Sequence, residues 1–327
     1  MNIFICQTPF QLYYATIIIK HLGFSNNLKF CIIHSNLNCD ELKEYSEVEL
    51  LNSLTSRQTI NTVKQLKTIK NRIDELVSQK DITNFFMPHV GGFIANYVFF
   101  SKKLKNKIKV NFYYEGILYF YDYQESYRLY HLKRILLGYT LGFKYHYVKN
   151  ILPYNSDKIE KIYSPLKALT KGPINKIVEL PFSSKIKKTP KEKDTYLILG
   201  GPINNLQDFY ERILKTIIKN SGKSAVVYYK GHSSFLTHHK KDKEAFANIA
   251  KKHNINYQEL DITSPVEALI KDLKISSIYS YYSSALVNIK LMDPQGYDII
   301  CYLNDKMKII KDIEHVFKFL NIKIIRF

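Results

Sequence analysis

The chain contains the stretch Ala225-Val226-Val227-Tyr228-Tyr229-Lys230-Gly231-His232. Its β-branched and aromatic residues predict a buried strand, and this strand ends abruptly at a cation, a glycine and an imidazole. Open α/β sheets bind their ligands at the carboxyl ends of their strands. Similar strand ends occur at Tyr113-Tyr114-Glu115-Gly116 and at Ser280-Tyr281-Tyr282-Ser283-Ser284. The sequence therefore predicts an α/β protein with polar side chains at the ligand-binding edges of its sheets.

Strand and helix patterns alternate on both sides of this stretch, which is typical of mostly parallel sheets. A charged segment with a proline, at 185–194, predicts a boundary between an N-terminal domain at 1–184 and a C-terminal domain at 195–327. Two Rossmann-like domains with a cleft between them form the GT-B type of α/β fold, which we expect here. The predicted strands are 1–6, 29–34, 82–88, 109–114, 195–199, 225–229, 255–259, 277–279 and 298–302. The predicted helices are 11–21, 41–80, 90–100, 206–219, 242–253, 265–272 and 284–292.

The composition indicates two folded domains in a reducing compartment. The 327 residues are 46% hydrophobic and 14% aromatic, which is enough for two hydrophobic cores. The four cysteines form no CxxC pair, so neither a disulfide framework nor a zinc site is expected. The first residues do not resemble a signal peptide, and no apolar run approaches the roughly 18 residues that a membrane span needs. We expect a cytoplasmic protein, either soluble or peripheral on the inner face of the plasma membrane.

The net charge is +19, and only six of the 48 lysines and arginines are arginine. Proteins that read nucleic-acid sequence rely on the bidentate contacts of arginine, so a nucleic-acid partner is not expected. The lysine excess has two interpretations, a solvated basic surface or attraction to an anionic membrane face or substrate. The aromatic and basic stretch 119–147 also has two interpretations. It suits sugar stacking or a membrane surface, or a buried aromatic core with a solvated basic face.

The strand ends of the C-terminal half supply groups that suit a phosphorylated ligand. Lys230 would offset phosphate charge, Gly231 would allow the backbone to approach closely, and His232 would donate a proton to a departing phosphate oxygen. The alternative is a solvated lysine beside an incidental histidine. Ser283 and Ser284 precede a predicted helix, whose N-terminal N–H groups would bind phosphate, unless one serine is only the N-cap.

Other polar positions of this half have two interpretations each. Ser264 fits an N-cap before a proline at the first helical position, and Glu267 fits either a capping box or a contact with ribose hydroxyls. Gly200 and Gly201 form a tight strand-to-helix turn, which either admits a nucleotide or only redirects the chain.

Two carboxylates are candidates for a general base. Glu115 ends a strand of the N-terminal half, where it would take a proton from an acceptor hydroxyl, or it is an ordinary turn residue. Asp208 is the second candidate, or it complements the dipole of a predicted helix. The sequence has no DxD-like cluster to hold a metal with a nucleotide sugar, so no metal or other cofactor is expected.

Taken in order, several short motifs resemble those of bacterial sialyltransferases of glycosyltransferase family 52 and of the related bacterial polysialyltransferases. The motifs are Ile5-Cys6-Gln7-Thr8-Pro9-Phe10-Gln11, Glu115-Gly116, Lys230-Gly231-His232, Ser264-Pro265-Val266-Glu267 and Ser283-Ser284. The resemblance covers most of the chain, and only the ordered combination is specific. It implies an inverting, metal-independent transfer of sialic acid from CMP-sialic acid to a terminal sugar of a bacterial capsule or lipooligosaccharide, with galactose the expected sugar.

The resemblance also implies roles for individual residues. Glu115 would be the base, ranked ahead of Asp208, and His232 would be the acid. Two positions depart from the family pattern, because Tyr114 stands where a second acid is usual and Ser233 stands where a proline follows the histidine. The alternatives are a related transferase with another nucleotide sugar, such as a glucosyl or Kdo donor, or a basic glycan- or nucleic-acid-binding protein without enzymatic activity. The residues expected to contact substrate are Gln7, Thr8, Pro9, Gly200, Gly201, Lys230, Gly231, Ser264, Glu267, Ser283 and Ser284.

Overall fold

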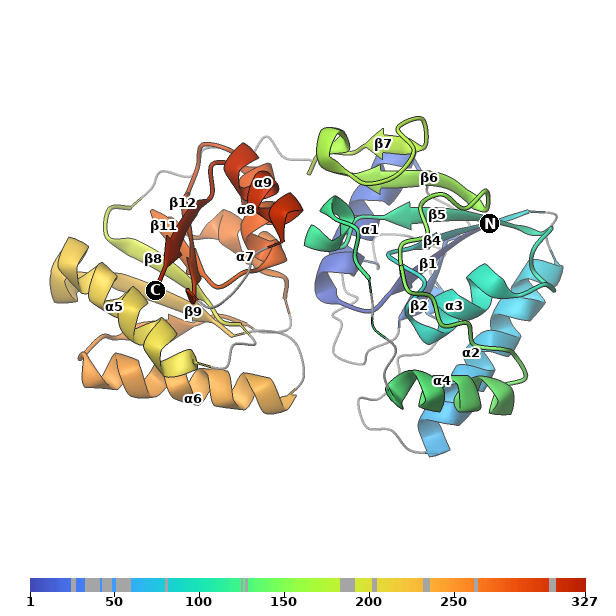
Figure 1. Ribbon diagram of the computed structural model, residues 1–327, viewed down its shortest axis with the longest axis horizontal. Coiled ribbons are helices and arrows are strands. Elements are labelled where there is room, and N and C mark those ends of the chain that lie inside the picture. Colours follow the sequence, from blue (N-terminus) through green and yellow to red (C-terminus); the bar gives the residue numbers. More distant parts are fainter. Residues whose placement is uncertain are drawn as a thin grey trace. The chain divides into compact units, whose positions relative to one another are not determined.

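The computed structural model describes residues 1–24, 28–32, 42, 49–50, 60–79, 82–124, 126, 129–182, 192–201, 205–231, 236–261, 264–305 and 310–327. The chain divides into two compact units, Met1–Phe182 and Ser183–Phe327. Each unit is built on its own parallel sheet with helices packed against it (Figure 1). Two parallel α/β domains of this kind confirm the predicted GT-B type of fold.

Within the described residues, the first unit contains a seven-stranded sheet in the order β3-β2-β1-β4-β5-β6-β7, with every neighbouring pair parallel. The chain leaves β1 toward one edge and returns to β4 on the other side, so the strand order reverses between β1 and β4. Ligands of open α/β sheets bind at such a reversal. The elements are β1 (Asn2–Cys6), α1 (Pro9–Leu22), β2 (Leu28–Ile32), β3 (Glu49–Leu50), α2 (Ile60–Ser78), β4 (Thr83–Met87), α3 (Phe93–Phe100), β5 (Ile108–Tyr113), the 3-10 helix η2 (Ile117–Phe120), α4 (Leu129–Thr140), β6 (Ile159–Ser164), the 3-10 helix η3 (Lys167–Leu169) and β7 (Ile177–Glu179).

Aromatic residues in register hold the centre of this sheet together. Phe4 of β1 lies opposite Phe30 of β2 and Phe86 of β4. Its ring stacks on both, with ring centroids 5.3 Å and 4.4 Å apart, and all three side chains are buried. Because side chains alternate between the two faces of a strand, this register places three rings on one face beside the reversal point.

Within the described residues, the second unit contains a six-stranded parallel sheet in the order β10-β9-β8-β11-β12-β13, which reverses between β8 and β11. The helices α5 and α6 cover one face of the sheet, and α7, α8 and α9 lie on the other (Figure 1). The elements are β8 (Thr195–Leu199), α5 (Leu206–Ser221), the 3-10 helix η4 (Gly222–Ser224), β9 (Val226–Lys230), α6 (Leu236–Lys252), β10 (Tyr257–Glu259), α7 (Val266–Leu269), the 3-10 helix η5 (Ile270–Asp272), β11 (Ser277–Ser280), α8 (Ser284–Met292), β12 (Asp298–Leu303), α9 (Lys311–Phe319) and β13 (Lys323–Arg326).

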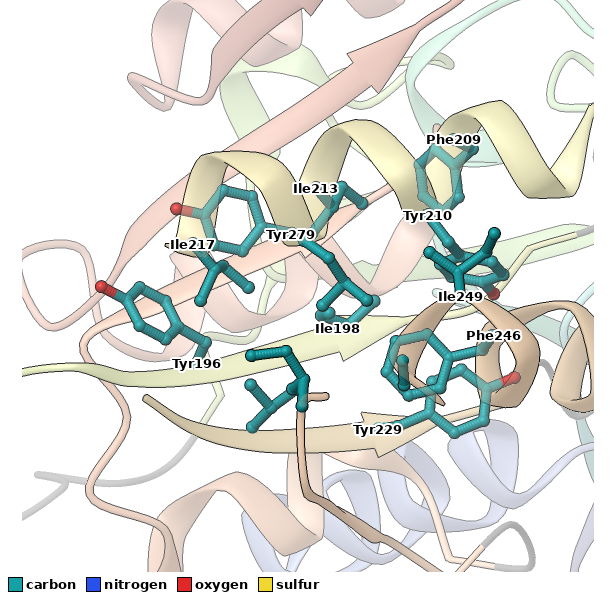
Figure 2. Close-up of a cluster of buried hydrophobic side chains, with 14 of the residues drawn as sticks. Tyr196, Ile198, Phe209, Tyr210, Ile213, Ile217, Tyr229, Phe246, Ile249 and Tyr279 are labelled. Atoms are coloured by element: carbon teal, nitrogen blue, oxygen red, sulfur yellow. The ribbon is translucent and has the colours of Figure 1, made fainter. Parts of the chain in front are cut away.

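The core of the second unit lies between its sheet and the helices α5 and α6 (Figure 2). Alternate residues of β8, Tyr196 and Ile198, point into this core, as the two-residue period of a strand requires. Ile213 and Ile217 of α5 are fully buried against them, one helical turn apart. Because all neighbouring strands of the sheet are parallel, their carboxyl ends lie together at one edge.

Most predicted elements are present, and one is wrong over part of its length. The prediction of a helix at 41–80 is wrong at Glu49–Leu50, which pairs with β2 as the edge strand β3. It is confirmed over α2, Ile60–Ser78, and residues 43–48 and 51–59 lie outside the described residues. A strand of two residues is too short to show an alternating pattern in the sequence. The short strands β7 and β13 at the sheet edges and the strand β6 were not predicted, for a related reason: exposed charged residues interrupt their apolar pattern.

Candidate functional site

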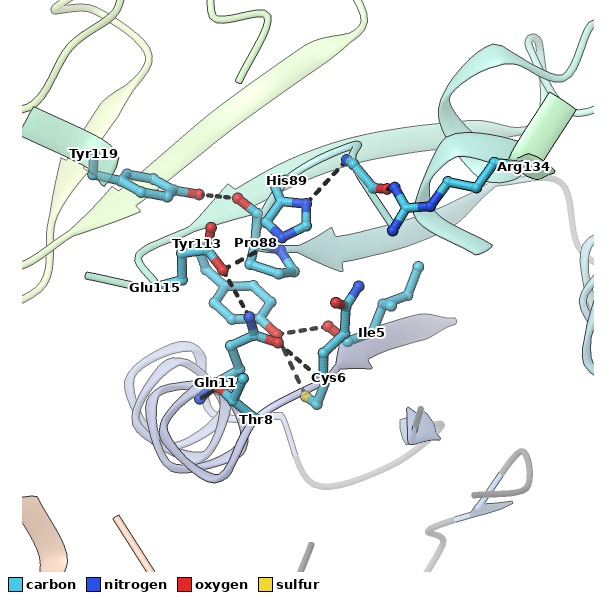
Figure 3. Close-up of polar contacts among 12 residues, drawn as sticks. Ile5, Cys6, Thr8, Gln11, Pro88, His89, Tyr113, Glu115, Tyr119 and Arg134 are labelled. Atoms are coloured by element: carbon cyan, nitrogen blue, oxygen red, sulfur yellow. Dashed lines mark hydrogen bonds and ion pairs between the residues drawn. The ribbon is translucent and has the colours of Figure 1, made fainter. Parts of the chain in front are cut away.

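Glu115 lies just beyond the carboxyl end of β5, and its two carboxylate oxygens have different surroundings (Figure 3). Oε2 accepts a hydrogen bond of 2.7 Å from the side-chain amide of Gln11 in α1. Oε1 is buried and has no hydrogen-bond partner among the described residues. The side chain as a whole is 8% exposed. A buried acceptor without a partner is uncommon in proteins and indicates a position that a ligand could complete.

His89 is a residue of this site that the sequence analysis missed. It follows β4, and its Nε2 lies 3.6 Å from Glu115 Oε2. Its Nδ1 accepts a hydrogen bond of 3.0 Å from the backbone N–H of Gly91 (Figure 3). The proton of the neutral ring is therefore on Nε2 and faces the carboxylate. The signal was available, since Pro88-His89-Val90-Gly91-Gly92 follows a strand just as Lys230-Gly231-His232 does.

Gln7 and Gln11 connect the end of β1 to Glu115. The backbone N–H of Gln7 donates to Gln11 Oε1 at 2.6 Å, which orients the Gln11 amide so that its nitrogen faces the carboxylate. The Gln7 side chain lies over Gly92, where a Cβ atom would be 2.2 Å from Gln7 Nε2. Gln7 Nε2 is buried and has no partner among the described residues. We call Gln7, Gln11, His89 and Glu115 the Glu115 site. As far as the described residues go, it combines a donor and an acceptor that both lack a hydrogen-bond partner.

Thr8 and Pro9 shape the start of α1. The hydroxyl of Thr8 accepts a hydrogen bond of 3.2 Å from the backbone N–H of Gln11, and Pro9 is the first residue of the helix. A threonine N-cap followed by proline is a common helix start. These two residues therefore position Gln11.

Tyrosines surround the Glu115 site, and they remain protonated. Burial raises the pKa of Tyr113, Tyr119 and Tyr154 well above the ordinary value, and the charge of Glu115 adds to the increase. The Tyr119 hydroxyl donates to the backbone oxygen of Pro88 at 2.7 Å (Figure 3). Phenols with raised pKa values act as hydrogen-bond donors at neutral pH.

Tyr114, which stands where the sialyltransferase pattern has a second acid, belongs to the core. Its side chain is fully buried. Its ring packs against Tyr14, Phe120 and Phe182, with ring centroids 5.4–6.2 Å apart. Glu115 is therefore the carboxylate at this strand end.

Lys230 ends β9 in the second unit and is buried, with 6% of the residue exposed. Its Nζ donates a hydrogen bond of 2.7 Å to the backbone oxygen of Asp261. Among the described residues, no carboxylate lies within ion-pair distance of it. Burial lowers the pKa of Lys230 to about 8, while the charges of Asp261 and Glu267 partly counteract this. The interpretation of Lys230 as a solvated lysine is wrong, because the residue is buried. Desolvating an ammonium is costly, and an anionic partner would offset that cost.

Glu267 and Asn288 lie near Lys230. Glu267, in α7, is 4% exposed, and its Oε1 accepts a hydrogen bond of 2.6 Å from the Asn288 side chain of α8. Burial raises the pKa of Glu267, although the Asn288 hydrogen bond and the Lys230 charge oppose the shift. We call Lys230, Asp261, Glu267 and Asn288 the Lys230 site. Glu267 was predicted, and Asn288 was missed because nothing in a helix-interior asparagine distinguishes it.

The sequence predicts helix N-caps at Ser264 and at Ser283 or Ser284, and the structure has a serine N-cap only at the second of these places. Ser283 is the N-cap of α8, since its hydroxyl accepts a hydrogen bond of 3.2 Å from the backbone N–H of Ala285, and Ser284 is the first helical residue. The predicted N-cap role of Ser264 is wrong. Its hydroxyl donates to Asp261 Oδ2 at 2.7 Å, and Pro265 occupies the cap position of α7.

Gly200 is needed for packing at the end of β8. Its backbone N–H donates to the Lys230 oxygen at 2.9 Å, and a Cβ atom would lie 2.0 Å from Asp242 Oδ2. Asp242 is buried and accepts hydrogen bonds from the Tyr210 and Tyr229 hydroxyls. At Gly201 a Cβ atom would meet only the Tyr281 side chain, at 3.3 Å.

Gly231, Asp208 and His232 are the remaining residues that the sequence analysis singled out. Gly231 is buried directly after Lys230. Asp208 is exposed in the first turn of α5 and accepts a hydrogen bond from Asn205, which fits the helix-dipole interpretation. His232 lies outside the described residues. Among the described residues, no group of three or more histidine, cysteine, aspartate or glutamate side chains is arranged to hold a metal ion.

No protein-family model matches this sequence, and no curated protein matches it either. Solved structures share its fold at low identity. Anabaena HepE, solved with UDP and glucose, has a TM-score of 0.51 and 8% identity over 93% of this chain and 80% of HepE. The UDP-GlcNAc 2-epimerase of Methanocaldococcus jannaschii has a TM-score of 0.51 and 13% identity over 100% of this chain and 89% of the epimerase. A Listeria monocytogenes protein named as a UDP-N-acetylglucosamine 2-epimerase has a TM-score of 0.53 and 12% identity over 92% of this chain and 78% of that protein.

These comparisons correct the family suggested by the short motifs. The expected membership of sialyltransferase family 52 is wrong, because no family model matches and the three solved structures compared above were either solved with UDP and glucose or named for UDP-N-acetylglucosamine. CMP-sialic acid as donor and a capsule or lipooligosaccharide product lose their support with it. The motifs that carried the resemblance are only two to seven residues long. The comparisons establish the fold, which is of the GT-B type.

Proposed function

We propose that this protein is a glycosyltransferase that takes its sugar from a UDP-sugar and uses Glu115 as the general base. The structural neighbours support the choice of donor, since one was solved with UDP and glucose and two are named for UDP-N-acetylglucosamine. The observation that carries the proposal is the Glu115 carboxylate, whose Oε2 accepts the Gln11 hydrogen bond and whose Oε1 has no partner in the described part of the chain.

The chemistry at Glu115 is a proton transfer. The hydroxyl of the acceptor gives its proton to Oε1, while the acceptor oxygen forms a bond to the anomeric carbon of the donor sugar. The bond between that carbon and the phosphate oxygen breaks, and UDP leaves with the electron pair. The Gln7 amide nitrogen, which has no partner in the residues that the structure describes, supplies a donor that can hold the acceptor oxygen.

His89 is better suited to positioning Glu115 than to acting as the base. Its Nδ1 lone pair is occupied by the Gly91 N–H, and its Nε2 proton faces Oε2. The neutral ring therefore has no lone pair left for an acceptor hydroxyl.

The Lys230 site supports a role in binding the diphosphate of the donor. The Lys230 ammonium is buried at the end of β9, and the N-terminus of α8 follows β11, on the other side of β8 in the same sheet. A cation and a helix N-terminus both favour the charge that builds on a departing diphosphate. The Glu267 carboxylate, one hydrogen bond away from α8, fits a contact with ribose hydroxyls.

Ligand-induced stabilisation and product formation test this function together. We expect UDP to raise the melting temperature of the protein more than CMP does, because a ligand that binds only the folded state stabilises it. We further expect UDP release from UDP-glucose or UDP-N-acetylglucosamine when glycan acceptors are added. Stabilisation by CMP and not by UDP would contradict the proposed donor.

Two of the neighbours are named as epimerases. Incubation of the protein with a UDP-sugar in the absence of an acceptor distinguishes that activity from glycosyl transfer. An epimerase would change the configuration of the UDP-sugar without an acceptor, which NMR of the sugar protons detects. Conversion of this kind in place of acceptor-dependent UDP release would contradict the transferase proposal.

A further inference from the structure

Helix α4 carries a row of exposed apolar side chains. Leu129, Leu132, Leu136 and Tyr139 are 70%, 43%, 58% and 62% exposed. Their spacing of three, four and three residues places them on one face of the helix. We call these four residues the α4 stripe. Monomeric soluble proteins rarely leave such a row uncovered, so it indicates an interaction surface.

The opposite face of α4 is held against the unit by specific contacts, so the stripe is oriented outward. His131 is buried, with its ring 4.7 Å from that of Tyr147. Arg134 donates to the backbone oxygen of Gly91 at 2.7 Å. At Gly138 a Cβ atom would lie 2.9 Å from the backbone oxygen of Phe143. The helix thus packs a histidine, an arginine and a glycine inward and directs leucines to solvent, the reverse of an ordinary amphipathic surface helix.

The sequence of α4 and of the segment that follows it, up to Ser156, is basic. Between Ser126 and Ser156 there is no aspartate or glutamate, and there are five lysines and arginines. Lys133 on α4 and Lys144 and Lys149 after it are exposed. An apolar row flanked by lysines is the pattern of helices that lie in the interface of an anionic bilayer.

We propose that the α4 stripe docks this protein on the surface of an anionic lipid bilayer, with its apolar side chains in the interface and the neighbouring lysines against the headgroups. A second copy of the chain is a poorer occupant, because a twofold contact through the same face would bring the lysines of both copies together. No helix in the described parts of the chain is long and apolar enough to cross a membrane, so the contact is peripheral. This proposal is independent of the UDP-sugar activity.

Vesicle co-sedimentation of the full chain tests the proposal. We expect binding to vesicles of phosphatidylcholine with about one third phosphatidylglycerol and weak binding to phosphatidylcholine alone, with salt reducing the former. The double variant L132Q/L136Q should lose about tenfold or more of the affinity, since two buried leucine side chains contribute at least that much. The double variant K133E/K144E should lose binding to the anionic vesicles specifically.

A matched control is Ile174→Gln, which removes another exposed apolar side chain of the same unit, 62% exposed and outside α4. It should bind vesicles like the parent protein, and the melting temperatures of all variants should agree. Unchanged vesicle binding by L132Q/L136Q would overturn the proposal. A lower melting temperature of that variant would also overturn it, because it would mean that the stripe packs within the protein. So would a parent protein that is a dimer and that the variant converts to a monomer.

Discussion

Glu115 illustrates how much one side chain depends on residues that are distant in the sequence. Gln11 lies 104 positions earlier in the chain and His89 lies in a different loop, and both contact the same carboxylate oxygen. The sequence identified Glu115 as a candidate because it ends a strand before a glycine. The asymmetry of its two oxygens, on which the proposed role of base rests, comes from α1 and from the loop after β4.

Replacing Glu115 by glutamine should lower turnover by about 10²- to 10⁴-fold, the usual contribution of a general base, because the amide has nearly the same shape but cannot accept the proton. UDP binding should be unchanged, since the Lys230 site lies in the other unit. Steady-state UDP release and UDP titration measure the two effects. His89→Ala should cost less than Glu115→Gln. An inactive His89 variant beside an active Glu115 variant would show that the base is assigned to the wrong residue.

Lys230 should make UDP binding depend on pH. Its pKa of about 8 means that the ammonium is present at pH 7 and largely lost at pH 9, so the Kd for UDP should rise above pH 8. Calorimetric titration at several pH values measures this. Lys230→Met removes the titrating group and should weaken binding at pH 7 and flatten the dependence.

The same pKa also changes stability with pH. The value in the folded state lies below the ordinary 10.5, so between about pH 8 and 10.5 the unfolded chain binds more protons than the folded one. The Lys230 contribution to the free energy of unfolding therefore rises with pH across this window, and Lys230→Met should lack that rise. An identical pH dependence of stability in parent and variant would contradict the buried cation.

At the scale of elements, short polar segments were harder to predict than apolar ones. Strands β1, β8 and β11 have mostly buried residues and were predicted nearly at their observed bounds. The edge strand β3 has two residues, one of them charged, and its pairing with β2 is a tertiary contact. Helix α4 shows a further limit, since its leucine spacing is typical of a buried face and the contacts of His131 and Arg134 turn that face outward.

Because α6 packs against the end of β8, replacement by alanine should lower the free energy of unfolding by different amounts at the adjacent residues Gly200 and Gly201. Gly200→Ala should lower the free energy of unfolding by about 1–3 kcal/mol, because the added methyl group overlaps the Asp242 carboxylate, which the Tyr210 and Tyr229 hydroxyls hold in place. Gly201→Ala, whose Cβ meets only Tyr281, should cost less. Urea denaturation of both variants measures the difference. Equal stabilities would mean that Asp242 moves without cost.

At the scale of the whole molecule, the charge distribution indicates how the protein would balance the negative charge of a bound diphosphate. Lysines dominate its charge, and its described residues contain no cluster of three metal-binding side chains. We expect UDP release to continue at an unchanged rate in EDTA, because Lys230 and the start of α8 would balance the charge of the leaving group. Activity that is abolished by EDTA and restored by Mg²⁺ would contradict this expectation.

The sequence by itself determined the α/β class, the two-domain organisation of the GT-B type and the strand ends that carry Glu115 and Lys230. These properties depend on local apolar periodicity and on glycines after strands, which are visible along the chain. It did not determine the family, since motifs of two to seven residues are too short to specify one.

Only the tertiary structure decided which polar groups are buried, paired or unpaired. It placed His89 and Gln11 on one oxygen of Glu115, buried Lys230 beside Glu267 and Asn288, and turned the leucines of α4 to solvent. The physical reason is the same in each case. Burial and hydrogen bonding depend on contacts between elements far apart in the chain, and side-chain periodicity within one element does not specify which partner it will meet.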